Sequence, residues 1–341
     1  MTTSRTLLQE RLISIVKRFN DRRILVVGDA IADQFVYGAI SRVSREAPVF
    51  ILRHEQTETV PGGAANCAMN LVSLGANVAL IGAVGKDSAG RALVEKLESG
   101  GVDCSGLLTS EKLQTTTKVR ILAGQLHSTR QQVIRLDYDG SALNSGFHDP
   151  LLKSIAEEVQ NVDAVIVSDY NYGVVGPEVK EAVQEKAAAK KIPILVDSRY
   201  RLSAFEGFTS ATPNEDEVEQ LLGKQFDGAT ALELEGEAMR ERLGYRALLI
   251  TRGSHGMVLF EDAAQPFHID AVGPREPVDV TGAGDTVIAT YTLALASGAS
   301  FPDAARLANY AGGIVVMKRG TASVTGNELQ NSILNTDYAQ T

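Results

Sequence analysis

Short runs of β-branched and aliphatic residues recur along this chain, and stretches with helical spacing of apolar residues lie between them. The runs predict strands at 24–27, 78–82, 164–168, 194–197, 247–251 and 257–260. The helical patterns lie at 66–74, 88–97, 177–189, 215–222, 229–243, 286–296 and 303–318. Strands that alternate with helices form a mainly parallel sheet with helices on both faces. We therefore expect an α/β fold, a three-layer doubly wound sheet.

Two segments, at about 34–60 and 113–138, interrupt this alternation. Both are strand-like, carry polar residues at alternate positions and contain no good helical pattern. We expect them to form a small β-sheet that acts as a lid over the carboxyl ends of the main strands, where open α/β sheets bind ligands. Because the 341 residues contain no internal repeat or obvious linker, we expect one domain over 1–341.

The charge balance argues against nucleic acid as a partner. The chain has 33 basic and 42 acidic residues, a formal net charge of -9, and so lacks the cationic field that holds a polyanion. Charged residues interrupt the apolar pattern of the N-terminus, which predicts a surface helix and not a signal peptide, and no run approaches the ~20 apolar residues of a membrane span. The cysteines, Cys67 and Cys104, form no CxxC pair. We expect a cytoplasmic protein.

The sharpest local signal is Asp279-Val-Thr-Gly-Ala-Gly-Asp285, which runs directly into a helical pattern. The small residues Gly282, Ala283 and Gly284 would leave consecutive backbone N–H groups uncovered at a helix N-terminus, where a phosphate fits. Asp285 beside that phosphate could accept the proton of an attacking hydroxyl during phosphoryl transfer. The alternative is a glycine-rich turn in which Asp285 caps the helix, and the motif alone leaves both open.

Two other turns carry residues suited to a small ligand. Gly62 and Gly63 would let a ligand approach the backbone before a predicted helix, and the Asn66 amide can both donate to and accept from sugar hydroxyls. Asp29 and Asp33 follow the first predicted strand, where carboxylates can hold vicinal hydroxyls. The structural alternatives are a tight turn in the first case and a helix cap or turn in the second.

Taken together, these motifs resemble those of a known family, the ribokinase-like (PfkB) carbohydrate kinases. The matching stretches cover nearly the whole chain: GGAAN (62–66), TPNEDE (212–217), ITRGSHG (250–256), DVTGAGD (279–285) and ANYAGGIVVMKRGTASVT (308–325). Within the family the chain is most similar to kinases that convert D-glycero-β-D-manno-heptose 7-phosphate to the 1,7-bisphosphate in the ADP-heptose pathway. The resemblance implies ATP and Mg²⁺ as cofactors. The alternatives are a kinase of another sugar or nucleoside, such as fructose or ribose, and a catalytically silent sugar or nucleotide sensor.

The resemblance also implies roles for individual residues. Asp285 would be the catalytic base, and the anion hole would be formed by Gly282, Ala283 and Gly284. The nucleotide would be bound by Asn214, Arg199, Thr251, Gly253, Gly256, Asn309, Gly312 and Gly313. Mg²⁺ would be organised, through water, by Asn214 and Glu217. The sugar would be held by Asp33, Gly62, Gly63, Asn66 and Arg135.

The chain departs from the heptose-phosphate kinase pattern at positions where a cation is expected. Gln34 and Tyr172 replace Lys or Arg, and a phosphorylated substrate needs cations or fixed donors to offset its desolvation. Four arginines could substitute: Arg42, Arg45, Arg120 and Arg135. The bifunctional relatives carry an HxGH nucleotidyltransferase motif that this sequence lacks, so we expect the kinase step alone. A homodimer is expected from the relatives, and a separate nucleotidyltransferase is a candidate partner.

Overall fold

The larger of two β-sheets organises the molecule. A computed structural model describes residues 2–124, 130–140, 145–226, 228–274 and 276–335. The strands of this sheet are β1 (Arg23–Gly28), β4 (Asn77–Gly85), β5 (Val102–Asp103), β6 (Leu107–Ser110), β9 (Ala164–Asp169), β10 (Ile194–Ser198), β11 (Ser210–Ala211), β12 (Ala247–Thr251), β13 (Met257–Glu261) and β14 (Phe267–Ile269). Their order in space is β14-β13-β12-β11-β10-β9-β1-β4-β5, and β6 pairs with β4.

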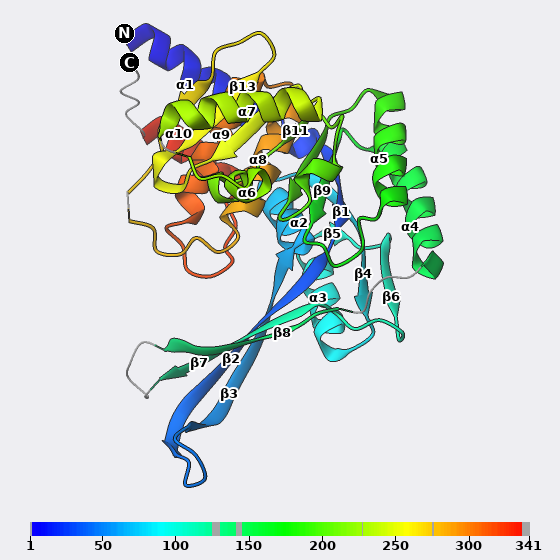
Figure 1. The fold of residues 1–341 in the computed structure, drawn as a ribbon, viewed down its shortest axis with the longest axis vertical. Helices are drawn as coiled ribbons and strands as arrows, with labels where there is room; N and C mark the ends of the chain where they lie inside the picture. The colour runs from blue at the N-terminus through cyan, green and yellow to red at the C-terminus, as the bar shows by residue number, and fades with distance from the viewer. Residues whose placement is uncertain (1, 125–129, 141–144, 227, 275, 336–341) are drawn as a thin grey trace.

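Helices cover both faces of this sheet and complete three layers (Figure 1). One face packs against α1 (Thr2–Val16), α2 (Ala64–Ser73), α3 (Ser88–Ser99), α8 (Ala283–Ala296), α9 (Phe301–Val315) and α10 (Gly326–Asn335). The other packs against α4 (Ser145–Glu158), α5 (Pro177–Lys190), α6 (Glu215–Leu222) and α7 (Ala229–Leu243). Because side chains alternate along a strand, Ile24 and Val26 of β1 enter the first core, and Leu25 and Val27 the second. The predicted three-layer fold is confirmed.

All predicted strands and helices are present, and most of them have shifted bounds. The helix predicted from 286 begins at Ala283, which places Asp285 in its first turn, and the helix predicted to run to 318 ends at Val315. The helices α4 and α10 were not predicted. The sheet is also not parallel throughout, since β13 runs antiparallel to β12 and to β14. Only residues 252–256 join β12 to β13, and so short a connection permits a hairpin but not a parallel crossover.

The order of the strands reverses direction at β1. This strand pairs in parallel with β4 on one side and with β9 on the other, so the chain winds outward from it in both directions. Such a switch point opens a crevice at the carboxyl ends of the strands. Those ends are Gly28 of β1, Asp169 of β9 and Ser198 of β10.

A second, four-stranded sheet projects from the body (Figure 1). It consists of β2 (Ala30–Val43), β3 (Phe50–Gly63), β7 (Thr117–Gly124) and β8 (Gln131–Tyr138), in the order β3-β2-β7-β8. A single residue, Asp29, separates β1 from β2, and β3 leads directly into α2, so the base of this sheet lies beside the crevice. The accessory sheet predicted at 34–60 and 113–138 is therefore present, although residues 125–129 lie outside the described part. Among the described helices, none combines the length and apolar character needed to cross a membrane.

Candidate active site

A cavity of about 330 Å³ lies where the switch point meets the base of the second sheet. It collects most of the residues that the sequence predicted for a site. From the predicted sets, its lining includes Asp33, Gly62, Gly63, Asn66, Arg135, Arg199, Asn214, Glu217, Thr251, Gly282, Ala283, Gly284 and Asp285. These residues come from both sheets and from α2, α6 and α8, so the fold brings together motifs that are far apart in the chain.

The helix α8 presents an uncapped N-terminus to this cavity. Its N-cap is Gly282, and no side chain among the described residues caps it. Gly282 has a φ of 76°, in the left-handed region that disfavours residues with a Cβ, and an added Cβ would lie 2.6 Å from Nδ2 of Asn66. The N–H of Ala283 donates to the carbonyl of Val280 at 3.2 Å, so one of the three expected donors is already used.

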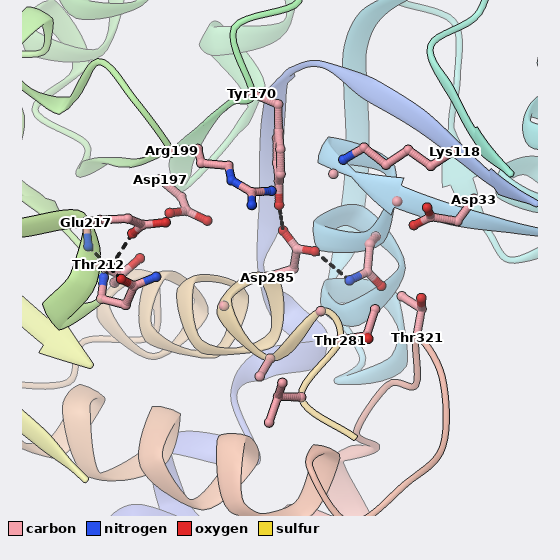
Figure 2. Close-up of a pocket in the computed structure, with 18 of the residues that line it drawn as sticks. Asp33, Lys118, Tyr170, Asp197, Arg199, Thr212, Glu217, Thr281, Asp285 and Thr321 are labelled. Atoms are coloured by element: carbon pink, nitrogen blue, oxygen red, sulfur yellow. Dashed lines mark hydrogen bonds between the residues drawn. The ribbon is translucent and has the colours of Figure 1, made fainter. Parts of the chain in front are cut away.

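Asp285 lies in the first turn of α8 and is only 4% exposed. Nδ2 of Asn66 donates to Oδ2 of Asp285 at 2.6 Å, and the Tyr170 hydroxyl donates to Oδ1 at 3.0 Å (Figure 2). The carboxylate therefore does not cap its own helix, which was the structural alternative. Burial raises the pKa of Asp285 to about 6, although these two donors oppose the shift. A carboxylate with such a pKa is ionised at neutral pH and more basic than an ordinary Asp.

The cavity has two chemically different ends, with Asp285 between them (Figure 2). At the end formed by the second sheet, Arg120 donates to Oδ1 of Asp33 at 2.6 Å, so the Asp33 carboxylate is paired rather than free. Lys118 lies beside this pair, 5.4 Å from the centre of the Tyr170 ring, and burial lowers its pKa. Arg135 also lines this end. We refer to Lys118, Arg120 and Arg135 as the cationic end.

The opposite end is rich in oxygen atoms. Asn214 and Glu217 form a capping box at the start of α6, in which Asn214 Oδ1 accepts from the Glu217 N–H at 2.8 Å and Glu217 Oε2 accepts from the Asn214 N–H at 2.9 Å. Burial raises the pKa of Asp197 well above its usual range, and the facing Glu217 carboxylate raises it further. The Thr212 hydroxyl is buried there without a hydrogen-bond partner among the described residues. We refer to Asp197, Thr212 and Glu217 as the acidic end.

Some predicted nucleotide-binding residues lie outside the cavity lining: Gly253, Gly256, Asn309, Gly312 and Gly313. Three of them contact the segment that follows β14. Nδ2 of Asn309 donates to the Asp270 carbonyl at 2.7 Å, and a Cβ on Gly256 or Gly313 would collide with backbone at Ile269 or Val272. The structure thus gives Asn309, Gly256 and Gly313 a packing role, and the role of all five residues in nucleotide binding stays a prediction.

Asp29 does not reach the cavity lining. The residue is 2% exposed, and its carboxylate accepts from the N–H groups of Tyr170, Tyr172 and Val174 at 2.8, 3.1 and 3.1 Å. The structural alternative is therefore correct for this residue, which anchors the loop after β9 instead of binding hydroxyls.

Sequence reasoning missed part of the site. The lining also includes Lys118, Arg120, Asp169, Tyr170, Asp197, Thr212, Val280, Thr281 and Thr321, of which only Arg120 was considered, as a substitute cation. For two pairs of these residues, the sequence did contain a pattern that could have placed them in the site. Lys118 and Arg120 are two apart in a predicted strand and so share a face, and Asp169 and Asp197 stand at the carboxyl ends of predicted strands.

The fold and cavity define a class of α/β enzyme that can hold an anion at a helix N-terminus and remove a proton beside it. The chain belongs to the pfkB family of carbohydrate kinases, whose match covers residues 21–327, and it is a sugar kinase. The family predicted from the motifs is thereby confirmed.

Curated relatives of the chain include bifunctional proteins. "Bifunctional protein HldE" of Marinomonas sp. is 40% identical over 312 residues, which are 91% of this chain and 64% of the relative. The protein of the same name from Nitrosococcus oceani is 41% identical over 318 residues, 92% of this chain and again 64% of the relative. The chain thus spans less than two-thirds of the length of these relatives.

Solved structures show the ribokinase-like fold. Arabidopsis thaliana ribokinase complexed with ribose and ATP has a TM-score of 0.72 at 20% identity, covering 92% of this chain and 99% of that one. Escherichia coli phosphofructokinase-2 in complex with potassium has a TM-score of 0.74 at 19% identity, with coverages of 92% and 98%. At these identities the likeness concerns the fold alone.

Proposed function

We propose that the chain is an ATP-dependent kinase of a phosphorylated sugar, and that its substrate is D-glycero-β-D-manno-heptose 7-phosphate, converted to the 1,7-bisphosphate. The observation that carries this proposal is the position of Asp285, a desolvated carboxylate beside an uncapped helix N-terminus and between a cationic and an acidic end. The similarity to bifunctional relatives over less than two-thirds of their length supports the kinase step as the shared one.

The cationic end supports a substrate that already bears an anionic group. The cations absent at Gln34 and Tyr172 are offset by Lys118, Arg120 and Arg135, which line the same cavity from β7 and β8. Arg120 is paired with Asp33 and Arg135 with Asp137, whereas Lys118 makes ring contacts with Tyr170 and Tyr172. Lys118 is therefore the cation with the most to gain from a substrate phosphate. The second sheet, which carries these cations, would act as the lid.

The acidic end supports a nucleotide with its metal ion. Burial raises the pKa of both Asp197 and Glu217, and the Glu217 charge raises that of Asp197 further. A divalent cation offsets such crowding of buried carboxylates, and Mg²⁺ prefers oxygen ligands. Asp197, Thr212 and Glu217 fit such an ion, whereas Asn214 holds the Glu217 side chain through its capping box. Bound there, Mg²⁺ would neutralise charge on the ATP phosphates. Arg199 lines the cavity nearby and would pair with the same phosphates.

The chemistry of the transfer would then be performed by α8. Asp285 accepts the proton of the attacking sugar hydroxyl, because its raised pKa suits a general base near neutral pH. The N-terminal backbone donors of α8, next to Gly282 and Gly284, stabilise the charge on the transferred phosphoryl group. The lid sheet excludes water, so that ATP is spent on the sugar and not on hydrolysis.

Substitution of Lys118 tests the substrate class. Lys118→Met is expected to raise KM for heptose 7-phosphate by about 10- to 100-fold, the value of one charge-assisted hydrogen bond, and to change KM for unphosphorylated sugars little. Steady-state kinetics with heptose 7-phosphate, fructose, ribose and adenosine measure both effects. Arg42→Ala is the control, because Arg42 is an exposed cation of the same sheet outside the cavity.

Each other outcome of this panel favours a named alternative. Equal losses on all sugars would contradict anion recognition by Lys118. Faster turnover of fructose, ribose or adenosine would identify a kinase of an unphosphorylated substrate. Nucleotide binding without turnover of any substrate would identify a catalytically silent sensor.

A homodimer is the proposed assembly, with the second sheet as its interface. Every second residue at the end of β8 is apolar and exposed: Ile134 (49%), Leu136 (42%) and Tyr138 (47%). Arg135 lines the cavity, so these three side chains, at alternate positions, point away from it. β8 is also an edge strand, and an exposed apolar edge pairs readily with another chain. Ile134→Asp is expected to convert a dimer to a monomer in light scattering after gel filtration. A wild-type chain that is already monomeric would refute this interface.

A cytoplasmic location and a separate nucleotidyltransferase partner remain part of the proposal.

A further inference from the structure

The loop after β9 is fixed at a defined place above the catalytic carboxylate. Its backbone N–H groups at 170, 172 and 174 all donate to the buried Asp29. Asn171 takes a left-handed φ of 64°, which turns the chain between two of these bonds. Because Asp29 lies between β1 and β2, this anchor ties the loop to both sheets. The side chain of Tyr170 therefore starts from a rigid base.

The Tyr170 phenol points from this loop to Asp285 (Figure 2). Its oxygen lies 3.0 Å from Oδ1 of Asp285. Loss of solvent raises the pKa of Tyr170 well above its usual value, and the nearby Asp285 charge raises it further. The phenol consequently keeps its proton and can act only as a donor towards the carboxylate.

The other carboxylate oxygen is held from α2 by a chain of buried side chains. Thr286 Oγ1 donates to Asn70 Oδ1 at 2.8 Å, and Asn70 Nδ2 donates to Asn66 Oδ1 at 3.2 Å. Because Asn66 Oδ1 accepts there, its Nδ2 faces Asp285 and donates to Oδ2. Asn70 is fully buried. Each oxygen of Asp285 thus has one donor, and each keeps a second lone-pair direction.

Other charged or titratable groups also interact with Asp285, and they come from β2, β7, β10 and α2. Asp33 of β2 raises its pKa and Lys118 of β7 lowers it. Asp197 of β10 and Cys67 of α2 both have a pKa that is raised by burial and further by the Asp285 charge. The effects of Asp33 and Lys118 on the pKa of Asp285 therefore oppose each other. A neutral substitution at Asn66 or Tyr170 would remove one hydrogen bond to Asp285 and leave all of these charges in place.

We infer that Tyr170 is a positioning residue for the transfer reaction: its phenol fixes Oδ1 of Asp285 and keeps this carboxylate ionised, while Asn66 fixes Oδ2. The inference rests on the proposed role of Asp285 as the base. The hydroxyl of Tyr170 contacts the Asp285 carboxylate and acts on the reaction through it, without a contact to the sugar or the nucleotide of its own.

Tyr170→Phe removes this donor and keeps the ring. For the wild-type enzyme, kcat/KM is expected to fall as the pH drops through about 6, because the base becomes protonated. In Tyr170→Phe the carboxylate loses a donor that favours its charged form, so this acidic limb should move up by about one pH unit. Well above the limb, kcat/KM should approach the wild-type value. A uniform loss at every pH with an unmoved limb would overturn the inference.

The matched control is Tyr172→Phe, from the same anchored loop. The Tyr172 ring is also near Lys118, at 6.0 Å, but the Asp285 contact is made by Tyr170 alone of the two. The acidic limb of kcat/KM for Tyr172→Phe should stay at the wild-type pH. An equal shift in both variants would point to the loop and not to the Tyr170 phenol.

Asp285→Asn distinguishes a failure of the proposed function from a failure of the inference about Tyr170. If it stays active, the proposed function fails, and if it is inactive while the Tyr170→Phe limb is unmoved, only the present inference fails.

A second substitution works in the opposite direction and does not depend on the stability of Tyr170→Phe. Incorporation of 3-fluorotyrosine at position 170 keeps the hydroxyl and makes it a stronger donor. The acidic limb of kcat/KM should then move to lower pH. A limb that stays in place, or that moves to higher pH, contradicts a donor role for Tyr170.

Discussion

Asp285→Asn is expected to lower kcat by about 10²- to 10⁴-fold, the usual contribution of a general base. An amide cannot accept the hydroxyl proton, yet it can accept from Asn66 and donate to the Tyr170 oxygen, so the cavity should keep its shape. Nucleotide affinity, measured by titration calorimetry with ATP and Mg²⁺, should persist. Asp216→Asn, an exposed carboxylate in the first turn of α6, is the matched control and should be fully active.

The same variant has a stability signature that is independent of turnover. The folded-state pKa of Asp285, about 6, exceeds the ordinary value of 3.8, so folding penalises the ionised form. This penalty is absent below the ordinary value, grows as the pH rises to about 6 and is complete above that. Asp285→Asn should therefore have a higher Tm than wild type at pH 8, and the difference should vanish towards pH 4. Substantial remaining turnover, or a Tm difference that does not change with pH, would refute the assignment of Asp285 as a buried general base.

Gly282→Ala is expected to lower kcat by about 10²- to 10³-fold, the usual cost of disturbing donors to a developing negative charge. The new Cβ would lie 2.6 Å from Nδ2 of Asn66 and would sit at a φ of 76°. It would therefore displace both the first turn of α8 and the amide that holds Asp285. Single-turnover kinetics with saturating ATP measure the loss in the chemical step itself.

Gly298→Ala is the matched control for this substitution. Gly298 follows the other end of the same helix, has a φ of 82° and leaves open space for a Cβ. Both variants should lose stability, by about 1–3 kcal/mol for left-handed strain, but only Gly282→Ala should lose activity. Comparable activity losses in the two variants would show that α8 acts through its stability and not through its N-terminus.

Much of the fold could be predicted from sequence because strand and helix patterns are local. The run at 247–251 and the helices at 215–222 and 229–243 agree with β12, α6 and α7 in their bounds. The antiparallel edge at β13 was missed because hydrophobic periodicity does not report strand direction. The helix α4 contains Pro150, which weakened its helical pattern, and tertiary packing of Leu151 and Ile155 stabilises it nonetheless.

The candidate site was predictable where its residues share a motif. The run 282–285 predicted free backbone donors at a helix N-terminus as one of two alternatives, and the structure shows that no described side chain caps this end of α8. Asp29 and Asp33 show the limit of this reasoning. Both follow the first strand, but Asp29 accepts from the 170–174 loop and Asp33 pairs with Arg120, and which partner each meets depends on strands that come much later in the chain.

By itself, the amino-acid sequence determined most of the strands and helices, the accessory sheet and the turn of small residues before α8, because each follows from the properties of neighbouring residues. Only the tertiary structure decided that Asn66 and Tyr170, 219 and 115 residues away from Asp285, both donate to its carboxylate. It also decided that Lys118 reaches the same cavity. Such contacts depend on which strands pair and on how loops are anchored, and these are set by the free energy of the whole fold and not by any local pattern.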